Sequence, residues 1–462
     1  YSLSQTRSRS AAFFANATYS YKGRYTVNGT ARYEGTNRMG KSRSARWLPT
    51  WNVSGAWNAH EEKFFSNLTS VLSHFTLKAS YSLTADRGPA DVTNSQAIIT
   101  SYSPYRPFTS IQESGLYIKE LENSELTYEK KHELNIGADM GFLNNRINLA
   151  VDWYKRNNYD LIGIVNTQGA GGQILKYANI ASMKSHGIEF TLSTKNIKTK
   201  DFNWNTDFIF SNAKNEVTDL KQNANVMELI SGNGFAKQGY PVRGLFSIPF
   251  VGLDKDGIPV IINEKGEATS TDINFQERQN TGFLKYEGPT DPTITGSLGN
   301  MFSYKGFRLN LFITYSFGNV IRLNPVFKAY YSDLTAMTRE FKNRWTLPGD
   351  EAKTNVPAIL SKRMYDSNED LKYAYNAYNY STERIAKGDF IRLKEISLAY
   401  DFPKAWINPL KLTDLSLKVQ ATNLFLIYAD DKLNGQDPEF FNAGGVASPV
   451  PRQFTITLRL GL

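Results

Sequence analysis

The sequence has 462 residues, of which 41% are hydrophobic and 21% charged, with no cysteine and a net charge of +9. The lack of cysteine excludes disulfides, thiolate metal sites and thiol catalysis. No stretch approaches the roughly 18 consecutive apolar residues of a membrane-spanning helix, which excludes a helical membrane protein. The composition still allows a membrane barrel, because a barrel strand presents only alternate side chains to lipid.

About thirteen segments show the alternation of apolar and polar residues that predicts β-strands. In chain order they lie near 11–22, 25–33, 46–58, 75–83, 133–140, 147–154, 186–196, 201–212, 292–304, 307–314, 388–402, 415–420 and 454–462. The last segment is the most regular. One of its faces carries Phe454, Ile456, Leu458, Leu460 and Leu462, and the other carries Thr455, Thr457 and Arg459.

The connections between these segments tend to alternate between short and long. Short or moderate connections lie at 22–24, 59–73 (with a short helix), 142–146, 196–201, 304–307 and 402–411. Longer ones lie at 36–46, 85–126, 157–185, 213–291, 318–388 and 428–452. A soluble sandwich has no reason to sort its connections in this way, whereas a membrane barrel has short periplasmic turns and long extracellular loops. The pattern therefore predicts an all-β fold, a transmembrane antiparallel β-barrel.

Aromatic residues make up 13% of the chain and gather where the short connections would meet the membrane interface. Examples are Tyr19, Tyr21, Tyr25, Phe142, Phe302, Tyr304, Phe307, Tyr400, Phe402 and Trp406. An aromatic girdle is expected there. Single-chain bacterial barrels have an even number of strands. About thirteen strands therefore predict that residues 1–462 are the C-terminal part of one larger barrel domain.

Four passages have a distinctive sequence, order and spacing. They are Tyr19–Arg38, Lys285–Asn319 (KYEGPTDPTITGSLGNMFSYKGFRLNLFITYSFGN), Gly388–Lys404 (GDFIRLKEISLAYDFPK), and Asn423–Glu439, which leads to the terminal PRQFTITLRLGL. These passages resemble the C-terminal half of the SusC/RagA-like TonB-dependent transporters. The resemblance implies a 22-stranded plugged barrel, of which this chain would supply about the last 13 strands. It places the plug and the TonB box upstream of the matched region.

The resemblance also implies a function. Such proteins import large nutrients across the outer membrane of Gram-negative bacteria, driven by the TonB complex, with a SusD/RagB-like surface lipoprotein as a lid. Transporter and lipoprotein often form a dimer of pairs. Similarity to the RagA type favours oligopeptides. A glycan importer, a passive porin and a soluble β-rich enzyme or carbohydrate-binding module are the alternatives. No enzymatic activity and no cofactor are implied.

The loop 318–388 is rich in aromatic residues, and long loops often carry function. We select Tyr330, Tyr331, Trp345, Tyr375 and Tyr378 as candidates for contact with the ligand or the lid. Such rings can stack on sugars or pack against peptide side chains. They can equally form a small core within the loop or a docking surface for the lid, and these alternatives are favoured.

Arg38, Lys41, Arg43 and Arg46 form a basic cluster on a predicted outer loop, with no acidic residue between them. Nucleic-acid binding would also require stacking aromatic residues on a suitable fold, so no nucleic-acid partner is expected. Contact with lipopolysaccharide phosphates suits such a cluster, because guanidinium groups bind phosphate in a bidentate manner. A solvated loop is an equally good interpretation.

No motif predicts a metal site or a catalytic residue. The four histidines, His60, His74, His132 and His186, lack the HExxH spacing of a zinc site. The segment 254–257, Asp-Lys-Asp-Gly, resembles the start of a calcium loop but lacks the later ligands, so a turn is the favoured interpretation.

Overall fold

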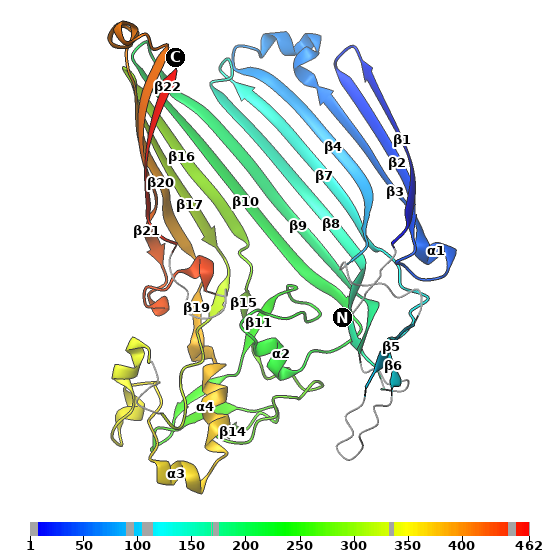
Figure 1. Cartoon of the computed structure of the whole chain (residues 1–462), viewed down its shortest axis with the longest axis vertical. Helices are drawn as coiled ribbons and strands as arrows, with labels where there is room; N and C mark the ends of the chain where they lie inside the picture. The colour runs from blue at the N-terminus through cyan, green and yellow to red at the C-terminus, as the bar shows by residue number, and fades with distance from the viewer. Residues whose placement is uncertain are drawn as a thin grey trace. The chain divides into compact units, whose positions relative to one another are not determined.

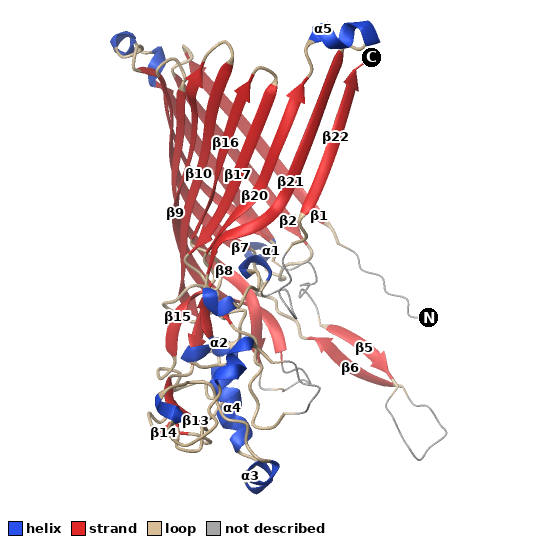
Figure 2. Ribbon diagram, turned by 90° about the vertical axis from the view of Figure 1, so that its left-hand side faces the viewer, coloured by secondary structure: helices blue, strands red, loops and turns tan. Residues whose placement is uncertain are grey.

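The computed structural model describes residues 8–88, 97–103, 114–167, 169, 175–331, 337–441 and 450–461, and most of them form antiparallel strands (Figures 1 and 2). Within these residues the main sheet has 13 strands, which follow one another in chain order. They are β1 (Ser10–Tyr21), β2 (Tyr25–Thr36), β3 (Trp47–Asn58), β4 (Leu72–Asp86), β7 (Glu129–Phe142), β8 (Ile147–Asn166), β9 (Leu175–Lys198), β10 (Phe202–Leu220), β16 (Ile294–Tyr304), β17 (Phe307–Phe317), β20 (Phe390–Asp401), β21 (Asp414–Ala429) and β22 (Gln453–Gly461).

The chain divides into two compact units, and the division passes through β9 and β10. The first unit comprises Tyr1–Ile188 and Asn215–Gln222, and the second comprises Glu189–Lys214 and Asn223–Leu462. No helix within the described residues has both the length and the apolar character needed to cross a membrane.

In the first unit, β1 to β4, β7 and β8 form a meander (Figure 1). The connection between β3 and β4 holds two short 3-10 helices, η1 (Ala59–Glu61) and η2 (Lys63–Asn67), where the sequence predicts a short helix. The connection between β2 and β3 holds α1 (Arg43–Arg46). The predicted long loop after β4 contains a hairpin of β5 (Ile98–Tyr102) and β6 (Gly115–Glu120).

In the second unit, β16, β17, β20, β21 and β22 are neighbours, and the short connection after β20 carries α5 (Lys404–Ile407) and the 3-10 helix η6 (Asn408–Leu410) (Figure 2). The turn between β16 and β17 has two central residues, Lys305 at φ 43° and Gly306 at φ 91°. Two positive φ angles are typical of the type I′ turn, whose twist matches that of a hairpin. The local sequence thereby fixes a tight reversal.

The long connections 223–290 and 320–387 of the second unit fold together into what we name the loop module. Its strands are β11 (Gly244–Ser247), β12 (Phe250–Leu253), β13 (Pro259–Ile262), β14 (Ala268–Thr269), β15 (Lys285–Pro289), β18 (Val320–Arg322) and β19 (Ile385–Lys387). Its helices are α2 (Val226–Ile230), α3 (Lys362–Ser367), α4 (Leu371–Asn379) and the 3-10 helices η3 (Arg339–Asn343), η4 (Asp350–Ala352) and η5 (Thr382–Arg384). After β21 follow the 3-10 helices η7 (Asp431–Leu433) and η8 (Pro438–Phe440).

Two apolar clusters form the core of the loop module. One surrounds Leu229, Phe246 and Ile248, and the other surrounds Phe327 and Tyr375. Most of the members of these clusters are less than 5% exposed, so this long region has a packed interior of its own. The two long loops that the sequence predicts in this region therefore form a small folded structure.

Strands β17, β20, β21 and β22 have one apolar and one polar face, as the alternation predicts. In the second unit, Leu309, Leu398, Val419 and Ile456 occupy directly opposed positions on β17, β20, β21 and β22. Asn310, Ser397, Gln420 and Thr455 form the adjacent row on the other face. Leu462, the predicted last apolar position, lies outside the described residues.

Three strands extend far into segments that the sequence predicts as connections. β8 continues to Asn166, β9 begins at Leu175 and β10 continues to Leu220, so the connections predicted at 157–185 and 213–291 are shorter. Their extra residues include Asn157, Asn158 and Asp160, which are polar on both faces of the strand. Alternation disappears where neither face meets an apolar medium, and the hydrophobic pattern then no longer marks the strand.

Candidate ligand-contact surfaces

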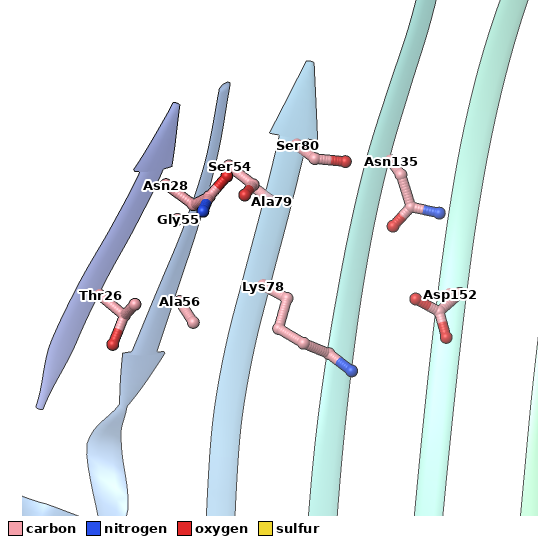
Figure 3. Close-up of a pocket in the computed structure, with 10 residues that line it drawn as sticks. All are labelled: Thr26, Asn28, Ser54, Gly55, Ala56, Lys78, Ala79, Ser80, Asn135 and Asp152. Carbon is pink, nitrogen blue, oxygen red and sulfur yellow. The ribbon is translucent and has the colours of Figure 1, made fainter. Parts of the chain in front are cut away.

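The polar face of the first unit is a wall of hydroxyl and amide groups (Figure 3). One row crosses five strands at directly opposed positions: Thr18, Asn28, Ser54, Ser80 and Asn135. The Asn28 amide donates to Thr18 Oγ1 at 2.6 Å, and the Asn16 amide donates to Thr30 Oγ1 at 3.1 Å. These hydrogen bonds between neighbouring strands orient the side chains of the polar face.

This wall lines a shallow hollow of about 350 Å³, where Lys78 and Asp152 stand beside the neutral side chains (Figure 3). Lys78 Nζ lies 2.7 Å from Asp139 Oδ2, so its charge is compensated on the neighbouring strand. A surface of this kind suits contact with water or polar groups, and it suits burial against an apolar core poorly.

A second hollow of the first unit, about 630 Å³, is lined by Arg32, Arg38 and Arg87 and by the carboxylates of Glu34 and Asp86. Glu34 forms ion pairs with both Arg32 and Arg87, the latter at 3.5 Å. The hollow therefore combines cationic and anionic groups on the polar face.

The four predicted basic residues have different surroundings. Arg38 lines this second hollow, and Lys41 Nζ lies 2.9 Å from Glu122 Oε2. Arg43 is exposed on α1, whereas Arg46 is half-buried and its carbonyl accepts a hydrogen bond from the Tyr128 hydroxyl at 3.3 Å. Arg43 is therefore the exposed arginine of this cluster, whereas Arg38 and Arg46 are half-buried.

The five predicted aromatic residues also differ in their surroundings. Tyr375 and Tyr378 are only 2% exposed and belong to the core of the loop module. Burial raises the pKa of both hydroxyl groups above the usual value of 10. The Tyr375 hydroxyl donates to the carbonyl of Ala358.

Tyr331, Trp345 and Tyr330 lie nearer the surface. The Tyr331 hydroxyl accepts from the Lys328 backbone N–H at 2.7 Å, and Trp345 Nε1 donates to Glu351 Oε2 at 3.0 Å. Tyr330 is 50% exposed and is the most accessible ring of the five. The favoured interpretation of a small core within the loop describes Tyr375 and Tyr378, while Tyr330 is available for contact.

Tyr330 lines a groove of about 600 Å³ on the loop module, which we name the α4 groove. Its lining residues are Pro325, Phe327, Lys328, Ala329, Tyr330, Tyr365, Lys372, Tyr373, Tyr375, Asn376 and Asn379. Rings, amides and ammonium groups therefore meet in one concave surface, the combination that is typical of ligand sites.

Three buried arginines were not singled out by the sequence analysis. Arg322 donates to the carbonyls of Ser381 and Phe246 and to Ser247 Oγ, at 2.8, 2.6 and 3.0 Å. Burial lowers the pKa of Arg322 to about 9, so the side chain stays protonated at neutral pH. The apolar run of Val320, Ile321 and Leu323 around it is the signal that could have marked it, since a buried charge needs partners.

Arg384 and Arg392 are buried as well. Arg384 forms an ion pair with Glu340, and Arg392 Nη2 lies 2.6 Å from Asp437 Oδ1. Both pairs join segments distant in sequence. They hold the loop module and the segment after β21 in a defined conformation within the second unit.

No group of three or more metal-ligating side chains occurs within the part of the chain that the structure describes. Asp254 Oδ1 instead accepts the backbone N–H groups of Asp256 and Ile258, both at 2.9 Å. This is the turn that the sequence analysis favoured over a calcium loop.

The family model described as TonB dependent receptor-like, beta-barrel matches residues 1–424. TonB-dependent receptor P3 of Formosa agariphila is 25% identical over 446 residues, which cover 92% of this chain and 41% of that protein. TonB-dependent receptor SusC of Bacteroides thetaiotaomicron is 26% identical over 484 residues, which cover 99% of this chain and 44% of that protein.

Among solved structures, the RagAB peptide transporter matches with a TM-score of 0.78 at 23% identity, over 98% of this chain and 48% of the compared chain. This likeness concerns the fold. The chain spans less than half the length of these relatives. Because the family model covers most of the sequence, the chain belongs to the TonB-dependent receptor-like β-barrel family.

Proposed function

We propose that this chain is part of a TonB-dependent importer that carries large nutrients, oligopeptides above all, across the outer membrane of a Gram-negative bacterium. It forms about the last 13 strands of a 22-stranded barrel domain whose lumen is plugged. The observation that carries the proposal is the match to the fold of the RagAB peptide transporter over 98% of the chain. Membership of the TonB-dependent receptor-like family supports the part of the proposal in which the TonB complex drives the import.

The two faces of the main sheet suit this role. In the proposed barrel the apolar face contacts lipid and the polar wall of Figure 3 faces the lumen. The loop module follows the ends of strands opposite the short turns, so in the proposed barrel it would face the extracellular side. A folded module with a groove is better suited to holding a ligand than a flexible loop, since less freedom is lost on binding.

The partners that we propose follow from the same resemblance. A SusD/RagB-like surface lipoprotein would cover the loop module, and the TonB complex would act through upstream sequence. Exposed Tyr330 is our first candidate for contact with the ligand or the lid, and the half-buried Tyr331 and Trp345 are further candidates. Arg43, with Arg38, Lys41 and Arg46 as neighbours in sequence, is the candidate for lipopolysaccharide phosphate. A dimer of transporter–lipoprotein pairs completes the proposed assembly.

The test is uptake by the source bacterium. A strain that lacks the complete gene should lose growth on oligopeptides as the sole nitrogen source and keep growth on free amino acids. A protonophore or loss of TonB should abolish peptide uptake by the wild type, because the transport is energised.

Other results would contradict the proposal. Normal growth on peptides with lost growth on a polysaccharide would point to glycan import. Uptake that persists after TonB is removed would point to a passive porin.

A further inference from the structure

The α4 groove carries charges that the structure leaves uncompensated. Lys328 and Lys372 line it, and both are exposed. Neither ammonium group has an ion-pair partner among the described residues, and no described carboxylate lines the groove. The nearby acidic side chains Asp366, Glu369 and Asp370 are exposed outside the lining. The described lining of the groove therefore carries two positive charges and no negative one.

The amide groups of α4 indicate what kind of ligand fits. Buried Asn379 accepts the backbone N–H of Phe327 at 3.1 Å and donates to its carbonyl at 2.7 Å. One side-chain amide thus pairs with both polar backbone groups of a single residue. Asn376 lies three positions earlier on the same helix, lines the groove, and has no hydrogen-bond partner among the described residues.

Aromatic rings form the remaining walls. Tyr330 and Tyr365 stack with their ring centroids 6.4 Å apart. Tyr373 is 38% exposed, and Lys372 Nζ lies 5.3 Å from its ring centroid. Rigid rings of this type bury apolar side-chain surface at a low cost in conformational entropy.

We propose that the α4 groove binds an extended acidic oligopeptide. Asn376 pairs with the peptide backbone, Lys328 and Lys372 bind a side-chain carboxylate of the peptide, and Tyr330, Tyr365 and Tyr373 contact the chain. The pairing of the Asn379 amide with the backbone of Phe327 is an example, within this protein, of the backbone contact that we propose for Asn376. This inference rests on the proposed function and specifies the class of peptide.

The experiment measures peptide binding to the full-length transporter in detergent by fluorescence anisotropy. The probes are a labelled peptide rich in glutamate and the matched peptide with glutamine at the same positions. The wild type should bind the glutamate peptide about tenfold more tightly, a ratio in the range of charge-assisted hydrogen bonds. The preference should shrink as the salt concentration rises, because salt screens exposed charges.

Substitutions test whether the lysines of the α4 groove cause the preference for the glutamate peptide. The double substitution Lys328→Gln and Lys372→Gln should reduce the roughly tenfold preference for the glutamate peptide to about one, because both positive charges of the groove lining are lost. Lys362→Gln is the matched control, because Lys362 is an exposed lysine of α3 outside the groove. Asn376→Ala should weaken both peptides equally, since both have the same backbone.

Failure of this inference is distinguishable from failure of the proposed function. Equal affinity for the two peptides in the wild type, or a preference that survives the double substitution, overturns the groove assignment while peptide import stands. Binding of an acidic oligosaccharide with no binding or uptake of any peptide overturns both.

Discussion

At the scale of single residues, the ion pair between Arg392 and Asp437 is the most completely buried in the described residues. Their side chains are 3% and 0% exposed, and Arg392 Nη2 lies within 2.7 Å of both carboxylate oxygens. Removing Asp437 leaves the buried charge of Arg392 with only the more exposed Glu439, 3.3 Å away, and loss of a buried partner typically costs about 3–5 kcal/mol. Asp437→Ala should therefore destabilise the second unit by about that amount, measured by thermal unfolding of the full-length protein.

The control for this prediction restores neutrality. Arg392→Met combined with Asp437→Leu replaces the pair by apolar groups and should recover most of the lost stability, because neither variant side chain requires a partner. A double variant as unstable as Asp437→Ala would show that the charge pair itself, and not the orphaned charge, holds the segment after β21.

The buried tyrosines give a dependence on pH. Burial raises the pKa of Tyr375 and Tyr378 above 10, so both stay protonated in the folded module while the unfolded chain ionises them. The unfolded state then binds fewer protons, and stability should fall as the pH rises above about 10. Replacement of both tyrosines by phenylalanine should reduce this loss of stability at alkaline pH. Denaturant unfolding of the wild type and the variant, at several pH values above and below that point, measures the difference. If the variant loses the same stability at alkaline pH as the wild type, other titratable groups cause the loss.

At the scale of elements, the sequence predicts the strands whose two faces differ in polarity, as in β21 and β22. It also predicts short turns such as that at Lys305 and Gly306. It misses the outer parts of β8 to β10, because a strand with water on both faces carries no alternation. It also misses the partners of Arg322 and Asp437, because pairing between distant segments depends on the tertiary fold.

The two faces of β22 allow a matched test. Ile456 is 74% exposed on the apolar face, and Thr457 is its neighbour on the polar face. A lysine facing the lipid midplane costs about 2–4 kcal/mol, whereas a lysine facing a water-filled lumen costs little. Ile456→Lys should therefore lower the stability of the inserted protein by up to this amount, and Thr457→Lys should not, as measured by denaturant unfolding in lipid vesicles. Equal losses would contradict the assignment of the faces.

At the scale of the whole molecule, the main sheet ends in two edge strands in the described residues, β1 and β22. Exposed sheet edges expose unpaired backbone groups, and a barrel in a membrane must pair them. Thirteen antiparallel strands closed on themselves would bring β1 and β22 together as a parallel pair. The proposed 22-stranded barrel instead inserts further strands between them.

Because the sequence has no cysteine, disulfide trapping distinguishes these two arrangements. Gln420 and Thr455 are directly opposite on β21 and β22, so Gln420→Cys with Thr455→Cys should form a disulfide readily in the full-length protein. Cysteines at Asn16, Thr18 or Ser20 of β1, each combined with Thr455→Cys, should form none, because the intervening strands hold them beyond the reach of about 7 Å between Cα atoms. Efficient bonding at any of these three β1 positions would show that β1 and β22 meet, and the barrel would then close without additional strands.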